Sequence, residues 1–287
     1  MQTRAHTTRR GFLKVAATGF AGIALWPELE KLQAASAGKI RIGSCMIGLE
    51  QAKQAGLDGV EVGCGNAAER LSIAMPETRA KYKEQMQNTG LPICSLMMGL
   101  LNSYPLATDP RGPAWLEQSI GAARDLGARV ILVAFFGKGD LLGPDGQIKE
   151  TELDEVVKRL KAAAPIAKDA GVILGIENYL NGEQNARILD RIGHDSVQIY
   201  YDVFNTGATK GYDVPKEIRA LKGRIAQFHF KNGPNYLESG QVKFEPIAAA
   251  IKEIGYEGWI VLETSSPSKD AVADARRNGE YARKLFV

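Results

Sequence analysis

Four side chains that commonly bind divalent metals each stand at the end of an apolar run. Glu177, Asp202, His229 and Glu263 close runs rich in Ile, Val, Leu and aromatic residues, at intervals of 25, 27 and 34 residues. Three carboxylates gathered at one place repel one another unless protons or a cation compensate them. One divalent ion held by oxygen ligands and one imidazole would do so. This ligand set suits Mn²⁺ or Mg²⁺, with Co²⁺ and Zn²⁺ as alternatives.

The runs belong to a pattern that repeats along the chain and would bring these side chains together. Eight short β-branched runs alternate with helical stretches, and a glycine precedes each run after the first: Gly56, Gly90, Gly127, Gly171, Gly193, Gly223 and Gly255. Gly accepts the left-handed conformation that closes a helix before a strand. Short, nearly continuous apolar runs are typical of buried parallel strands. The pattern predicts a single-domain (βα)8 TIM barrel, in which strand C-termini face the active site. An open doubly wound sheet is the alternative, but no G-x-G-x-x-G follows any run.

One predicted helix shows the buried stripe clearly. Its apolar residues fall at i, i+3, i+4 and i+7, at Leu153, Val156, Val157 and Leu160, as on a helix with a single buried face. Thr151 and Asp154 form a plausible capping pair at its start. Pro165 is expected to bend or interrupt this helix.

The first 37 residues resemble an export signal. Arg9-Arg10 is followed by Phe-Leu-Lys, then by a moderately apolar stretch, and then by small residues ending at Ala35-Ser36-Ala37. This is the order of a secretory signal of the twin-arginine type. The resemblance implies export of the folded protein through the twin-arginine machinery, to the periplasm or beyond. We therefore assign residues 1–37 to a signal peptide and residues 38–287 to the barrel.

Without the leader, the chain has no excess of basic charge. Five of the 36 Lys and Arg and two of the 33 Asp and Glu lie in residues 1–37, which leaves 31 of each sign in the domain. A neutral domain does not favour nucleic acid or an anionic membrane as partner, and no apolar run reaches the roughly 18 residues of a membrane span. Cys45, Cys64 and Cys94 are too few for a disulfide framework. We expect buried small side chains there rather than a thiolate metal site.

Six segments of the domain carry a resemblance to a known family: residues 56–62 (GLDGVEV), 109–111 (DPR), 123–127 (ARDLG), 176–178 (IEN), 229–232 (HFKN) and 255–263 (GYEGWIVLE). They resemble the xylose-isomerase-like TIM barrels, the sugar phosphate isomerase/epimerase family, over essentially residues 38–287. The resemblance implies that Glu177, Asp202, His229 and Glu263 bind one divalent ion, Mn²⁺ first. It also implies that Glu177 and Glu263 act as acid and base.

The residues that would read the substrate fit the family less closely. Glu183 matches a Glu that contacts substrate in ketose 3-epimerases, but Asn205 and Asn235 stand where those enzymes carry His and Arg. Lys231 could supply positive charge to a developing oxyanion, with an exposed loop lysine as the alternative. Glu61 would either contact substrate or enter a buried ion pair. We expect substrate contacts from Glu61, Glu183, Asn205 and Lys231.

The implied activity is that of a sugar isomerase or epimerase. A metal that bridges a carbonyl and a neighbouring hydroxyl stabilises the enediolate formed when a proton leaves the adjacent carbon, and a ketose, aldose or oxidised sugar would serve as substrate. Loss of a β-hydroxyl would instead give a dehydratase or lyase acting on a keto-sugar or inosose. A non-catalytic periplasmic sugar-binding protein is the rival from another class. Endonuclease IV shares the barrel but uses a histidine-rich trinuclear zinc site, whereas this chain has three histidines.

Overall fold

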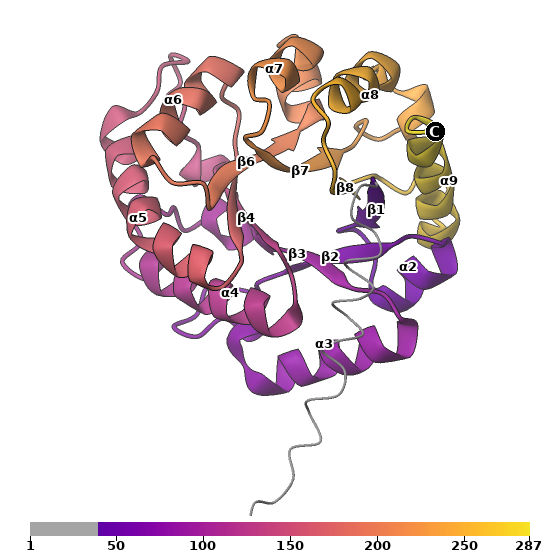
Figure 1. Cartoon of the computed structure of the whole chain (residues 1–287), viewed down its shortest axis with the longest axis horizontal. Coiled ribbons are helices and arrows are strands. Elements are labelled where there is room, and N and C mark those ends of the chain that lie inside the picture. Colours follow the sequence, from indigo (N-terminus) through magenta and orange to yellow (C-terminus); the bar gives the residue numbers. More distant parts are fainter. Residues whose placement is uncertain (1–39) are drawn as a thin grey trace, which may run out of the picture. The chain divides into compact units, whose positions relative to one another are not determined.

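Eight parallel strands close into a barrel in chain order, with helices around it, in the computed structural model of the protein, which describes residues 40–287 (Figure 1). The strands are β1 (Arg41–Ser44), β2 (Gly59–Gly63), β3 (Ile93–Met98), β4 (Val130–Ala134), β5 (Ile173–Glu177), β6 (Val197–Asp202), β7 (Ile225–Phe230) and β8 (Trp259–Leu262). β1 pairs with both β2 and β8, which closes the sheet. The predicted TIM barrel is thereby confirmed, and the open sheet is excluded.

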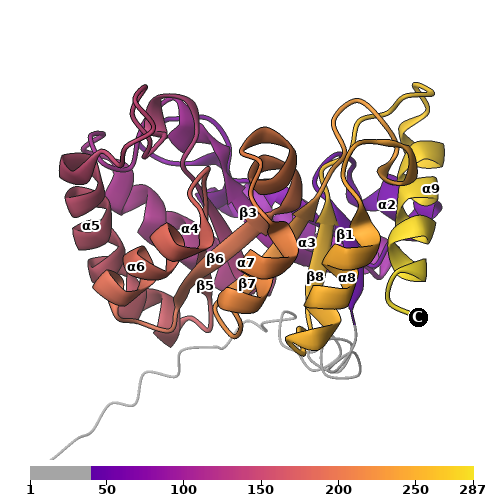
Figure 2. The same cartoon turned by 90° about the horizontal axis from the view of Figure 1, so that it is seen from above.

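Helices separate successive strands and form the outer layer. They are α2 (Leu49–Ala55), α3 (Pro76–Thr89), α4 (Gly112–Leu126), α5 (Glu150–Asp169), α6 (Gly182–Ile192), α7 (Val214–Ala220), α8 (Phe244–Glu253) and α9 (Ala271–Lys284). Figures 1 and 2 both place α5 and α9 on opposite sides of the barrel. No helix within residues 40–287 is long and apolar enough to cross a membrane. The predicted signal peptide lies outside the described residues and stays a prediction.

The glycines that precede the strands have the predicted conformation. All seven have φ between 66° and 76°, where a side chain would be strained. Gly90 shows the local reason, because it follows α3 directly and its N–H donates to the carbonyl of Met86 at 2.9 Å. Each helix can therefore end and turn back toward the barrel within a few residues.

Helix α5 starts at a different residue from the one predicted and is not interrupted by Pro165. It begins at Glu150, and Lys149 precedes it without a side-chain cap, so the predicted Thr151–Asp154 capping pair is wrong. The loop before α5 sets this start, because Leu142 pairs with Ile148 and the N–H of Lys149 donates to a loop carbonyl. Pro165 lies inside α5 without ending it. Its ring is on the exposed side of the helix, opposite the buried stripe that anchors α5 to the barrel.

The register of the last strands sets the candidate ligands side by side. Asp202 of β6 is paired with His229 of β7. The N–H of Glu263 donates to the carbonyl of Phe230 at the end of β7, and Glu177 is paired with Ala134 at the end of β4. Since all eight strands are parallel, these residues lie at the same end of the barrel.

Candidate metal centre

The four predicted ligands converge at the C-terminal end of the barrel. Glu177, Asp202, His229 and Glu263 each offer one ligand atom, and these atoms all lie within 4.8 Å of one another. From His229 Nδ1, the nearest oxygens are Glu177 Oε1 at 2.9 Å, Glu263 Oε2 at 3.5 Å and Asp202 Oδ2 at 3.9 Å. Atoms bound at about 2.0–2.2 Å to one ion are necessarily this close together, so the donor set fits a single divalent cation.

Asp202 is held by the backbone of the loop that follows it. Its Oδ1 accepts the N–H groups of Phe204 and Asn205 at 2.8 and 2.7 Å. Such local bonds from an Asp to the next N–H groups fix its side chain in one orientation. Its Oδ2 is buried, faces the other candidate ligands and lies 2.9 Å from the Lys231 ammonium. One oxygen of the carboxylate is thus used for positioning, and the other is available to a cation.

Glu177 ends β5 in a segment that is also fixed by side chains. Next to it, Asn178 accepts from the N–H of Leu180 at 2.8 Å and donates to Asn185 of α6 at 2.9 Å. Burial, together with the negative charges of Asp202 and Glu263, raises the pKa of Glu177 to about 7. Without a metal ion, Glu177 therefore keeps a proton more readily than a carboxylate in water does.

Lys231, two residues beyond His229, places its ammonium inside the cluster. Its Nζ donates to Glu263 Oε2 at 2.7 Å and lies 2.9 Å from Asp202 Oδ2. Burial alone would lower the pKa of Lys231, but these two carboxylates raise it. In turn, burial raises the pKa of Glu263, and the positive charges of His229 and Lys231 outweigh this and lower it. The lysine thus stands in for part of the positive charge that a metal would bring.

Comparison with known proteins agrees with this architecture. The family model described as "Xylose isomerase-like TIM barrel" matches residues 49–285. The chain belongs to this family. The barrel is similar to solved structures of 3-keto-D-glucoside 4-epimerase from E. coli (16% identity, TM-score 0.72, covering 86% of this chain and 100% of that one) and of L-ribulose 3-epimerase (22%, 0.69, 86% and 95%). A xylose isomerase-like TIM barrel protein from Mycobacterium smegmatis in complex with magnesium is similar at 18% identity (0.65, 83% and 86%). At these identities the structures establish the shared fold.

In this family barrel, Glu61 lies beneath the ligands rather than among the groups open to a substrate. Its side chain has no exposure, and its Oε1 is 3.1 Å from His229 Nε2. Of the two alternatives for Glu61, the structure shows the buried pairing with His229, and a substrate contact stays a prediction. The pairing is buried because Glu61 of β2 has no exposed side-chain surface.

The other predicted substrate contacts, Glu183, Asn205 and Lys231, lie after β5, β6 and β7 respectively. Asn205 is buried at the start of the helical turn η4 (Asn205–Thr209), and its recorded contact with the cluster runs through its backbone N–H to Asp202. Glu183 is exposed in the first turn of α6 and has no hydrogen bond or ion pair within residues 40–287. Lys231 alone of this group touches the ligands through its side chain. Glu183 is free to reach a substrate, whereas Asn205 chiefly supports Asp202.

Sequence reasoning missed three polar residues below the cluster: Ser95, Tyr200 and Gln227. All three are buried and hydrogen-bonded to one another or to Glu61. A signal was present, since Gln227 interrupts an otherwise apolar run. The cysteines follow the expectation in part: Cys64 and Cys94 are buried and free, whereas Cys45 is half-buried, close to His229.

Proposed function

We propose that the protein is a divalent-metal-dependent sugar isomerase or epimerase. The observation that carries this proposal is the convergence of three carboxylates and one imidazole, from four consecutive strands, within 4.8 Å at the C-terminal end of the barrel. Proteins similar in fold include a 3-keto-D-glucoside 4-epimerase and an L-ribulose 3-epimerase, and a third, xylose isomerase-like protein is in complex with magnesium. Their names support a sugar substrate, and the magnesium complex supports a divalent ion.

Glu177, Asp202, His229 and Glu263 would hold the ion, which would supply the positive charge that makes a carbon next to a carbonyl acidic. Glu177 and Glu263 stand on β5 and after β8, so they approach the centre from different strands. Glu263 is the more open of the two, with one third of its side chain exposed. One glutamate would take the proton from carbon, and the other would return it. The Lys231 ammonium, already 2.7 Å from Glu263, would hold a negatively charged substrate oxygen.

Replacement of each glutamate by glutamine tests the acid–base role. Glu177→Gln and Glu263→Gln keep an oxygen that can reach the ion but cannot accept a proton. We expect turnover to fall by about 10²-fold or more, the usual scale of general acid–base catalysis, while some metal is retained. The exposed Glu84 of α3 makes no contact with the site, so Glu84→Gln serves as the matched control.

The measurement is turnover of free ketoses, aldoses and keto-sugars in D₂O, followed by NMR and mass spectrometry. A product that carries deuterium on the carbon next to the carbonyl and otherwise has the same molecular formula as the substrate would support isomerisation or epimerisation. A product that has lost water would assign the protein to the lyases instead. Near-normal turnover in both Gln variants would show that another residue is the base.

A further inference from the structure

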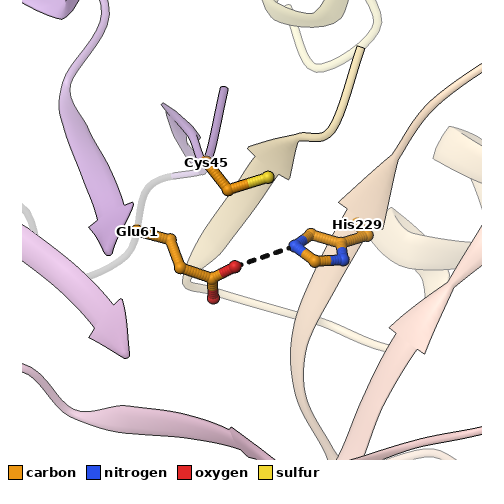
Figure 3. A group of neighbouring side chains, drawn as sticks. All are labelled: Cys45, Glu61 and His229. Carbon is orange, nitrogen blue, oxygen red and sulfur yellow. Dashed lines mark hydrogen bonds and ion pairs between the residues drawn. The ribbon is translucent and has the colours of Figure 1, made fainter. Parts of the chain in front are cut away.

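A closed polar network lies directly beneath the metal centre and ends on the ring of His229. Figure 3 shows the carboxylate of Glu61, from β2, directed at the imidazole, with Cys45 to one side. The two ring nitrogens have different partners. Nε2 is 3.1 Å from Glu61 Oε1, whereas Nδ1 is 2.9 Å from Glu177 Oε1, among the other ligands. The Nε2 edge of the ring therefore contacts the polar network, and the Nδ1 edge faces the metal centre.

The network determines which atoms carry protons. Gln227 Nε2 donates to both Ser95 Oγ and Tyr200 OH, at 2.7 and 2.8 Å. Each hydroxyl has a single proton, and each donates it to Glu61 Oε2, at 2.7 and 3.0 Å. The carboxyl thus receives two donors on one oxygen, and Oε1 remains as an acceptor toward His229. In this arrangement, Gln227 Oε1 has no hydrogen-bond partner within the described residues.

The backbone is shaped to build this network. The pairing of β2 with β3 shifts register between Val60 and Glu61, and that of β6 with β7 shifts between Ile199 and Tyr200. After the shifts, Glu61 is opposite Ser95 and Tyr200 is opposite Gln227. Such irregularities are frequent beside active sites, where they redirect side chains.

Tyr200 also fixes the plane of the imidazole. Its ring lies 4.5 Å from that of His229, centroid to centroid. Gly175 leaves the space for it, because a Cβ at this position would lie 3.1 Å from Tyr200 Cβ. The ring of His229 is therefore held both by a hydrogen bond and by packing.

We propose that Glu61 is a positioning residue that holds His229 with a proton on Nε2, so that Nδ1 presents its lone pair to the divalent ion. The inference rests on the proposed metal site and goes beyond it, because it assigns the tautomer and its cause. Ligating histidines commonly donate their second N–H to a carboxylate, which fixes the ring and increases the basicity of the ligating nitrogen. Here the carboxylate comes from the strand opposite the ligand strands, and two hydroxyls and an amide hold it in turn.

A second ion held by Cys45, Glu61 and His229 is the competing interpretation, since these groups also lie within 4.8 Å of one another. Such an ion would have to displace the His229 proton and share a carboxylate that already accepts from two hydroxyls. The number of ions bound separates the two interpretations.

The test combines metal titration with the NMR signature of the imidazole. Chelator-treated full-length protein is titrated with Mn²⁺ by calorimetry, and the Zn²⁺-loaded protein is used for ¹⁵N–¹H spectra of its histidines, with His194→Gln as an aid to assignment. We expect one equivalent of Mn²⁺ and a proton on Nε2 of His229. Glu61→Leu should weaken Mn²⁺ binding by about 10–100-fold, whereas Glu84→Gln and Cys45→Ala should not.

A double substitution separates the loss of ring orientation from a general disruption of the core. Glu61→Gln alone places an amide N–H₂ against hydroxyls that already accept from Gln227, so binding should fall. Glu61→Gln combined with Gln227→Glu restores an acceptor for both hydroxyls and leaves an amide oxygen for the Nε2 proton. Binding should return to within about tenfold of wild type, because the ring is again oriented.

Three results would overturn the positioning role while leaving the metal site intact: wild-type affinity in Glu61→Leu, a proton on Nδ1 in the loaded protein, or a second equivalent of metal that Cys45→Ala removes. Failure of the wild type to bind any ion would instead count against the proposed function itself.

Discussion

At the level of single residues, Lys231 has the most consequential contacts in the metal centre. The same oxygens that would bind a divalent ion, Asp202 Oδ2 and Glu263 Oε2, lie 2.9 and 2.7 Å from its ammonium. The ammonium and the ion must therefore compete for these oxygens or rearrange. This makes Lys231 both a stabiliser of the metal-free protein and a group that can turn toward substrate once the ion is bound.

Exchange of Lys231 for methionine should separate these effects. Lys231→Met removes the competing charge, so we expect Mn²⁺ to bind about tenfold more tightly, a difference of about 1.4 kcal/mol. The metal-free protein should melt at a lower temperature, because its buried carboxylates lose a cation. Calorimetric titration and thermal melts with and without chelator measure both, and Lys138→Met, on an exposed turn after β4, is the control. Unchanged affinity together with an unchanged melt would refute the competition.

At the level of elements, the loops that follow the strands hold the ligands in place. The loop between β8 and α9 begins with Glu263, and its serines are hydrogen-bonded to Asp274 in the first turn of α9. This carboxylate accepts from Ser266 Oγ, from the N–H and Oγ of Ser268, and from Tyr236 OH, at 2.6–3.0 Å. Since Tyr236 belongs to the loop after β7, Asp274 joins the two loops that carry Lys231 and Glu263.

Removal of Asp274 should therefore loosen two sides of the site at once. Asp274→Ala leaves several donors without a partner, and we expect a loss of about 1–3 kcal/mol in the free energy of unfolding. Weaker metal binding should accompany it, because Glu263 is less well placed. Urea unfolding measures the first effect, and Asp195→Ala, an exposed change in the loop before β6, is the control. A variant as stable as wild type would show that the loops do not depend on this carboxylate.

The lowered pKa of Asp274 leads us to expect that the stability of the fold depends on pH. Burial raises the pKa of Asp274, but the hydrogen bonds from Ser266, Ser268 and Tyr236 outweigh it and lower the pKa to about 2. A carboxyl whose folded pKa is below its ordinary value of 3.8 stabilises the fold above that value. Its contribution is lost as the pH falls toward 2. The stability difference between wild type and Asp274→Asn should therefore shrink from pH 4 downward.

For the molecule as a whole, the sequence predicts the barrel and the convergence of the four candidate ligands because both follow from local patterns. Each strand is a short apolar run after a glycine, and each ligand ends its own run. The capping pair at Thr151 fails because a loop pairing, rather than the local signal, starts α5. The partners of Glu61 could not be predicted, because they are 34 to 168 residues away and depend on two register shifts. Export through residues 1–37 stays a proposal, which a reporter fused to this segment would test.

We propose that Glu177, Asp202, His229 and Glu263 together form one divalent-metal site at the C-terminal end of the barrel. Calorimetric titration of Mn²⁺ into the chelator-treated wild-type protein, with His229→Ala and Asp202→Ala titrated in parallel, tests it most directly. We expect one equivalent of Mn²⁺ in the wild type, and at least 100-fold weaker binding in both variants because each loses a ligand atom. A wild type that binds no divalent ion, or variants that bind it as tightly as the wild type, would contradict the claim.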